Sequence, residues 1–188
     1  MSEIARNNTR GSAERYGSAS MRARLLMIVI LAMLTAMEIV LSRFLSVNAW
    51  NLKIGFSFVP VVVAGMLYGP LGGAAVAGLG DFLGAVLFPI GPYFPGFTAT
   101  ALLTGFVFGL FLKKEQTVVR AVCAVGINQL ILSLLLNTLW ISILYHNPYW
   151  PTLISRIPQC AILIPVQIIV ILVLAPAMHR LSAIKNAR

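Results

Sequence analysis

Long apolar runs separated by short links are the feature that most constrains how this chain can fold. Of its 188 residues, 59% are hydrophobic and 10% are charged, whereas soluble domains carry about 25% charged residues. About 20 apolar residues are enough for a helix to cross the hydrocarbon core of a bilayer. The pattern therefore predicts an all-α membrane protein with six transmembrane helices, expected at 24–45, 54–68, 71–87, 96–112, 118–145 and 152–178.

The basic residues predict which way these helices are threaded. Eleven of the fourteen Lys and Arg fall on one side of a six-helix threading, and such an excess marks the cytoplasmic side. We therefore expect both termini in the cytoplasm, with a basic tail at 1–21, a transmembrane domain at 22–180 and a basic tail at 181–188. This topology accounts for the net charge of +9 without nucleic acid. The eleven are Arg6, Arg10, Arg15, Arg22, Arg24, Lys113, Lys114, Arg120, Arg180, Lys185 and Arg188.

The first twenty residues are polar, and we expect them to be disordered or to lie on the membrane surface. In the first helix, Ala32 and Ala36 form a small-xxx-small pair that lets another helix approach closely. Glu38 lies on a different face of that helix. The pair could pack against another helix of this chain or against a partner.

The stretch Phe88–Thr100, between two apolar runs, combines rigidity with aromatic side chains. Its prolines fix φ and remove N–H donors, so an ordinary helix cannot pass through it. Aromatic residues of a loop at the membrane surface can form the wall or lid of a ligand pocket, or can serve as an interfacial anchor. Both interpretations fit Phe88, Tyr93, Phe94 and Phe97.

Ionisable and polar residues within the membrane are the remaining candidates for function, because an unpaired charge there is costly. Glu38 and Asp81 are the two acids, and we expect Arg43, Lys53 and Arg156 near the outer face. Internal ion pairing, for example between Asp81 and Arg156, is one explanation. The other is a site for an anionic aromatic solute. The fifth helix adds a polar face of Gln129, Ser133, Asn137 and Trp140.

Nothing in the sequence predicts an enzyme. It contains no GxSxG, no HExxH and no Gly-rich phosphate loop, and we expect no cofactor and no metal. The threading places Cys123 and Cys160 in opposite leaflets, so we expect no disulfide. Any uphill movement of a solute would need energy from a partner or an ion gradient.

Six short segments together resemble the folate-specific S component of the energy-coupling factor (ECF) transporters, over residues 22 to 180. The resemblance implies a six-helix vitamin-binding subunit of the bacterial cell membrane, working with a transmembrane coupling (T) subunit and two cytoplasmic ATPases. It also implies that Ala32 and Ala36 contact the coupling subunit. The segments are Leu41-Ser42-Arg43-Phe44, Lys53-Ile54-Gly55-Phe56-Ser57-Phe58-Val59-Pro60, Tyr68-Gly69-Pro70, Asp81-Phe82-Leu83-Gly84, Pro92-Tyr93-Phe94-Pro95-Gly96-Phe97-Thr98 and Leu136-Asn137-Thr138-Leu139-Trp140.

Folate fits the chemistry of the candidate residues. Its flat pterin needs stacking, for which Tyr93, Phe94, Phe97 and Trp140 are candidates. The donors of the pterin edge suit Asp81 or Asn137, and the two tail carboxylates suit Arg43, Lys53 and Arg156. The alternatives are the same architecture with another vitamin or anionic aromatic metabolite, and a membrane assembly subunit that binds no solute.

Overall fold

The computed structural model describes residues 2–49 and 52–186, with side chains placed for residues 21–46 and 55–178. The prediction of six helices is confirmed within that part of the chain, because α5, η1 and α6 form one continuous helix. The elements are α1 (Ser2–Arg43), β1 (Val47–Ala49), β2 (Leu52–Ile54), α2 (Phe58–Tyr68), α3 (Pro70–Leu87), α4 (Pro95–Leu112), α5 (Val118–Gly126), η1 (Ile127–Leu136), α6 (Asn137–Tyr145) and α7 (Tyr149–Asn186).

Five of these helices, in the described residues, are long and apolar enough to span a membrane, and α2 is the shorter sixth. At 1.5 Å per residue α2 covers about 16 Å, roughly half of the hydrocarbon core. Gly69, with φ of 82°, joins it directly to α3. That backbone conformation favours glycine, which explains the tight turn between Tyr68 and Pro70.

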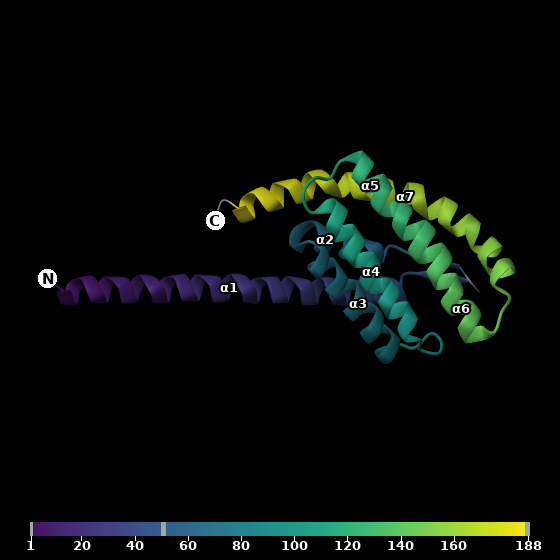
Figure 1. The fold of residues 1–188 in the computed structure, drawn as a ribbon, viewed down its shortest axis with the longest axis horizontal. Helices are drawn as coiled ribbons and strands as arrows, with labels where there is room; N and C mark the ends of the chain where they lie inside the picture. Colours follow the sequence, from purple (N-terminus) through teal and green to yellow (C-terminus); the bar gives the residue numbers. More distant parts are fainter. Residues whose placement is uncertain (1, 50–51, 187–188) are drawn as a thin grey trace.

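Helix α1 is longer than the sequence predicts. Its apolar span is Met21–Arg43, yet it begins at Ser2 and extends far beyond the bundle (Figure 1). Residues 2–20 are therefore helical, which differs from a disordered tail. That they lie on the membrane surface, the other expectation, stays a prediction. Residues 2–20 lack proline, and extending an existing helix avoids the cost of nucleation.

A small β-hairpin follows α1 where the sequence predicted a loop at 46–53 and a helix starting at 54. Strands β1 and β2 pair antiparallel, with Val47 opposite Ile54 and Ala49 opposite Leu52. Trp50 and Asn51 lie outside the described residues. The hairpin shortens α2, which begins only at Phe58.

Helices α3 and α4 approach each other through facing glycines. A Cβ at Gly73 would overlap the carbonyl oxygen of Gly105, and a Cβ at Gly105 would overlap that of Gly73. A Cβ at Gly65 of α2 would lie 2.9 Å from the backbone nitrogen of Gly109. The glycine backbones of α3 are thus closely enclosed by the neighbouring helices.

The middle of the long helix Val118–Tyr145 is a ten-residue π-helix, η1. A π-helix bonds i to i+5 and has a wider turn than an α-helix, and such segments occur frequently at functional sites. The sequence predicted an ordinary α-helix here. The polar face of this helix therefore repeats with more residues per turn than in an α-helix.

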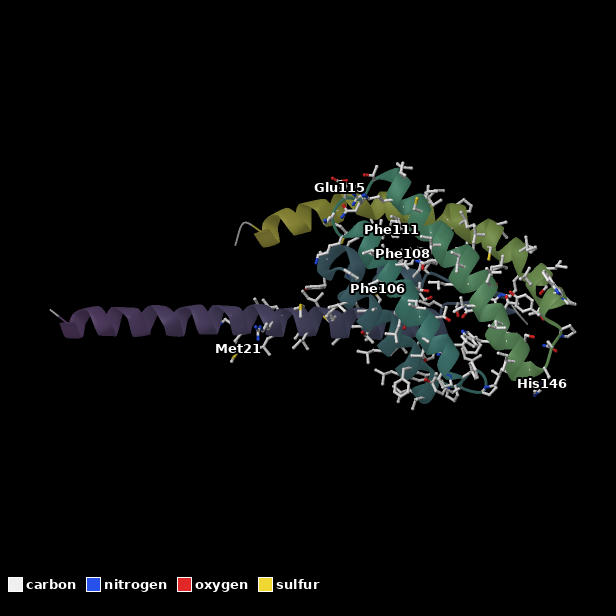
Figure 2. All side chains as sticks on the ribbon, in the orientation of Figure 1. Met21, Phe106, Phe108, Phe111, Glu115 and His146 are labelled. Carbon is white, nitrogen blue, oxygen red and sulfur yellow. The ribbon has the colours of Figure 1, made fainter. Side chains whose placement is uncertain are left out.

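The buried core runs from Leu112, at the end of α4, to the cavity, which its members Phe58, Val61 and Ala77 line. Phe108 and Val125 also belong to it. Figure 2 shows Glu115 of the α4–α5 link and His146, after α6, at opposite ends of the bundle. The start of α1 and the end of α7 lie on the side away from α6 (Figure 1).

Candidate functional site

A cavity of about 900 Å³ lies at the loop end of the bundle. Residues 55–57 after the hairpin, the loop 88–94 and the α6–α7 link border it, and every helix of the bundle supplies lining residues. It brings together Arg43, Asp81, Tyr93, Phe94, Phe97, Asn137 and Arg156, seven of the nine residues predicted from the sequence to bind ligand.

Aromatic side chains of the loop 88–94 and of the start of α4 form one wall. The rings of Phe94 and Phe97 meet edge to face with centroids 6.1 Å apart, a favourable aromatic geometry. Tyr93 lies edge to face with Phe82 of α3 at 5.9 Å. These contacts hold the rings in place, so the loop presents a formed apolar surface to the cavity.

Trp140 lies behind this wall and is not among the lining residues. Its ring packs against Phe94 with centroids 5.5 Å apart, and its indole N–H donates to Thr100 Oγ1 at 3.0 Å. Gly96 makes the packing possible, because a Cβ there would lie 2.5 Å from the Phe94 ring and 2.6 Å from Trp140. In this structure Trp140 supports Phe94, and its contact with a ligand stays a prediction.

The polar stripe of the long helix follows a spacing of four residues. Gln129, Ser133, Asn137, Ile141 and Tyr145 all line the cavity. The wide turn of η1 keeps i and i+4 on one face, whereas the α-helical period assumed from the sequence placed Trp140 on that face. The π-helix is thus the reason that Ile141 and Tyr145 line the cavity in place of Trp140.

Buried amides belong to this part of the cavity wall. Gln129 lies on the polar face expected from the sequence, whereas Asn128 was not predicted to belong to the site. The Nδ2 group of Asn128 donates to the carbonyl of Thr104 at 3.4 Å, so the amide oxygen Oδ1 takes no part in that hydrogen bond. The side-chain oxygens of Asn128, Gln129 and Asn137 are buried and have no hydrogen-bond partner. Buried acceptors without a partner are costly, so they suit a ligand edge rich in N–H donors.

Two glycines of α3 admit charged side chains of α1 at the edge of the cavity. A Cβ at Gly80 would overlap the carboxylate of Glu38, and a Cβ at Gly84 would lie 2.8 Å from Nε of Arg43. Arg43 also donates from Nη2 to the carbonyl oxygen of Asp81 at 3.4 Å. Glu38 lines the cavity as well, although the sequence did not predict whether it contacts a ligand or an internal partner.

Asp81 and Arg156 do not pair in the described part of the chain, where the ion pair found is that of Arg120 with Glu115 at 3.2 Å. The Asp81 carboxylate instead accepts a hydrogen bond from Thr98 at 2.8 Å. Arg156 is 6% exposed, and its Nε has no hydrogen-bond partner. A guanidinium buried in this way in a cavity wall is suited to an anionic group of a ligand.

Two further predictions concern residues outside the cavity lining. Lys53 belongs to β2, but its side chain lies outside the described residues. Ala32 and Ala36 are exposed on α1, whereas Thr35 and Glu38 are buried against the bundle. The Ala pair therefore faces away from the cavity and is accessible to lipid or to another protein.

Comparison with known proteins gives consistent matches over most of the chain. The family model described as "ECF transporter, substrate-specific component" matches residues 26–175. A protein of Clostridium novyi (strain NT), "Folate transporter FolT", is 38% identical over 76% of this chain and 84% of its own length. A protein of the same name from Leuconostoc mesenteroides subsp. mesenteroides is 35% identical over 74% of this chain and 79% of its own.

A solved structure matches the arrangement of the helices. It is described as "Crystal structure of FolT bound with folic acid", and the TM-score is 0.76 at 33% sequence identity. The match covers 80% of this chain and 92% of the solved chain. The similarity therefore extends over the bundle as a whole.

Proposed function

Because this chain belongs to the family of substrate-specific components of ECF transporters, we propose that it is the folate-binding membrane subunit of such an importer. Members of this family are transport subunits and not enzymes, and the long apolar helices make this a multi-pass membrane protein. The two curated relatives and the folic acid complex support folate as the ligand. In this proposal the cavity takes folate from outside the cell.

The observation that carries the proposal is the composition of the cavity wall. One space of about 900 Å³, within the usual range for ligand pockets of about 300–1,000 Å³, joins aromatic rings, unpaired amide oxygens and two guanidiniums. Folate is flat and aromatic at one end and carries two carboxylates at the other. Each part of the ligand therefore finds a complementary group along one cavity.

The chemistry of the wall assigns the two ends of folate to different residues. The 2-amino and ring N–H groups of the pterin match the acceptor oxygens of Asn128, Gln129 and Asn137, which lie along the long helix. Phe94 and Phe97 offer rings for stacking. The tail carboxylates match Arg43 and Arg156, with Lys53 as a further candidate.

The sequence carries no nucleotide-binding motif, so ATP-driven transport would take its energy from a partner. We propose a transmembrane coupling subunit and two cytoplasmic ATPases as the partners, with both termini of this chain in the cytoplasm of a bacterial cell. The exposed face of α1 around Ala32 and Ala36 is the proposed contact with the coupling subunit. Small residues there would allow close helix approach.

Equilibrium binding of tritiated folate to the purified, monodisperse protein tests the proposal. We expect saturable binding of about one folate per chain without ATP, competed by unlabelled folate and not by the cationic vitamin thiamine. Competition by thiamine, or by another vitamin better than by folate, would assign the cavity to that ligand. Absence of any saturable folate binding would contradict the proposed function.

A further inference from the structure

The loop 88–94, which walls the cavity, is joined to the helix bundle through a chain of two hydrogen bonds. Thr98, in the first turn of α4, donates from Oγ1 to Oδ2 of Asp81 at 2.8 Å. The hydroxyls of Thr98 and Tyr93 lie 3.2 Å apart. Because the single proton of Thr98 points to the carboxylate, Tyr93 is the donor in this second bond.

The two ends of this chain line the cavity, whereas Thr98 between them does not. Tyr93 belongs to an exposed loop segment, and Asp81 lies on α3. The carbonyl of Asp81 in turn accepts from Arg43 of α1. The Thr98 hydroxyl is therefore the connection between a loop side chain and two helices of the bundle.

Resting on the proposed function, we propose that Thr98 is a positioning residue that latches the loop 88–94 over the bound ligand. The loop borders the cavity together with residues 55–57 and the α6–α7 link, so a ligand that leaves between these segments passes the loop. A hydrogen bond to an ionised carboxylate is among the stronger kinds in proteins. Its loss frees Tyr93 and lets the loop open more often, which shortens the lifetime of the complex.

The test compares the dissociation of pre-bound tritiated folate from four variants, chased with excess unlabelled folate. Thr98→Val keeps the shape of the side chain and removes the hydroxyl, and we expect the dissociation rate to rise about tenfold, as for the loss of one hydrogen bond. Thr98→Ser should remain close to wild type because it keeps the hydroxyl. Tyr93→Phe should raise the rate by a smaller factor. Thr117→Val is the matched control, since Thr117 makes no side-chain cap hydrogen bond at the start of α5.

The double variant Tyr93→Phe/Thr98→Val distinguishes a latch from separate contributions. If Tyr93 acts through Thr98, the double variant dissociates no faster than Thr98→Val alone. The proposal would be overturned if the fold-increases in dissociation rate of the two single variants multiply in the double variant. It would also be overturned by an unchanged rate in Thr98→Val, or by a Thr98→Ser rate as high as that of Thr98→Val. Should Thr98→Val fail to fold, Tyr93→Phe breaks the same chain from the exposed loop and must still raise the rate.

Hydrogen exchange of the ligand-free protein separates this proposal from the proposed function. We expect amides of the segment 88–94 to exchange faster in Thr98→Val than in wild type or Thr98→Ser, because local opening controls exchange. This result needs no folate. Equal exchange in all three proteins would overturn the latch even if folate binds, and absent folate binding with faster exchange would leave the latch and reject folate as the ligand.

Discussion

Arg156 shows at the scale of one residue how this protein retains a charge inside a membrane domain. The side chain is buried, and the acids that share the cavity with it are Glu38 and Asp81. Asp81 is engaged by Thr98 and does not form an ion pair with Arg156 within the described residues. A buried cation whose acidic neighbour is occupied elsewhere favours a ligand that brings its own carboxylate.

The arginines should therefore discriminate between ligands with and without the glutamate tail. We expect Arg156→Ala and Arg43→Ala to lower the affinity for folate by about ten- to a hundredfold, because a charge-assisted hydrogen bond contributes ~1.5–3 kcal/mol. The affinity for pteroic acid, which lacks the glutamate, should fall much less. Equilibrium competition with both ligands measures the difference.

Arg120→Ala is the matched control for this pair, because Arg120 lies near the α4–α5 link in an exposed ion pair with Glu115. Its affinities for both ligands should equal those of wild type. An equal loss of folate and pteroic acid in Arg156→Ala would assign that residue to the pterin end or to the stability of the bundle.

The sequence located many of the site residues because intramembrane polar groups are conspicuous. Arg43, Asp81 and Arg156 stand out against apolar surroundings, and a charge there requires a reason. Asn128 was missed although it is an amide within an apolar run, because the expected α-helical period assigned the polar face to other residues. The position of Trp140 behind Phe94 was hidden for the same reason.

At the scale of the element, the π-helix η1 has the largest effect on the site. It sets the four-residue spacing from Gln129 to Tyr145, so the polar and aromatic groups of one helix all reach the cavity. Helix ends, by contrast, were predictable from proline and glycine. Pro70 begins α3 and Pro95 begins α4, as expected for a residue that tolerates the first turn of a helix.

The glycine contact between α3 and α4 makes a prediction about stability. Gly105→Ala places a methyl group against the backbone of Gly73, so the helices must separate. Overpacking of this kind typically costs about 1–3 kcal/mol. We expect a lower apparent unfolding temperature by scanning fluorimetry in detergent, with folate affinity reduced because α3 and α4 both line the cavity.

Gly126→Ala is the control, since it is the same substitution where a Cβ would meet nothing within 4 Å. Gly126 has helical φ of −58°, and replacing a helical glycine by alanine stabilises by about 0.5–1 kcal/mol. Its unfolding temperature should equal or exceed that of wild type. If Gly105→Ala behaves like Gly126→Ala, the close approach of α3 and α4 does not limit stability.

At the scale of the whole molecule, the packed core continues into the cavity wall, because Phe58, Val61 and Ala77 belong to both. The apolar runs predicted the number of helices, because a run of sufficient length forms a membrane-spanning helix. The orientation derived from the basic residues stays a prediction. The apolar runs did not predict the helical state of residues 2–20 or the hairpin β1–β2. Whether a polar segment extends a neighbouring helix or pairs as strands depends on the structure beside it. The apolar pattern of the sequence does not report this.

Helix α1 leaves the bundle with its apolar residues uncovered. Residues 21–30 are exposed throughout, and so are Ala32 and Ala36 further along. In a membrane this surface contacts lipid or another helix. We expect Ala32→Trp and Ala36→Trp to leave folate binding by the isolated subunit unchanged, because both residues face away from the cavity. Both should abolish ATP-driven folate uptake by vesicles containing the complete transporter, since a bulky ring holds the partner helix away.

Two further variants show what those results mean. Val173→Trp introduces the same ring at a position of α7 that is 70% exposed, and both binding and uptake should remain at the wild-type level. Thr35→Trp introduces it on the buried face of α1, and there both should be lost because the bundle cannot close. If Ala32→Trp and Ala36→Trp lose both binding and uptake, as expected for Thr35→Trp, the alanines support the bundle itself. If they keep both, as expected for Val173→Trp, the coupling subunit must bind a different surface of the protein.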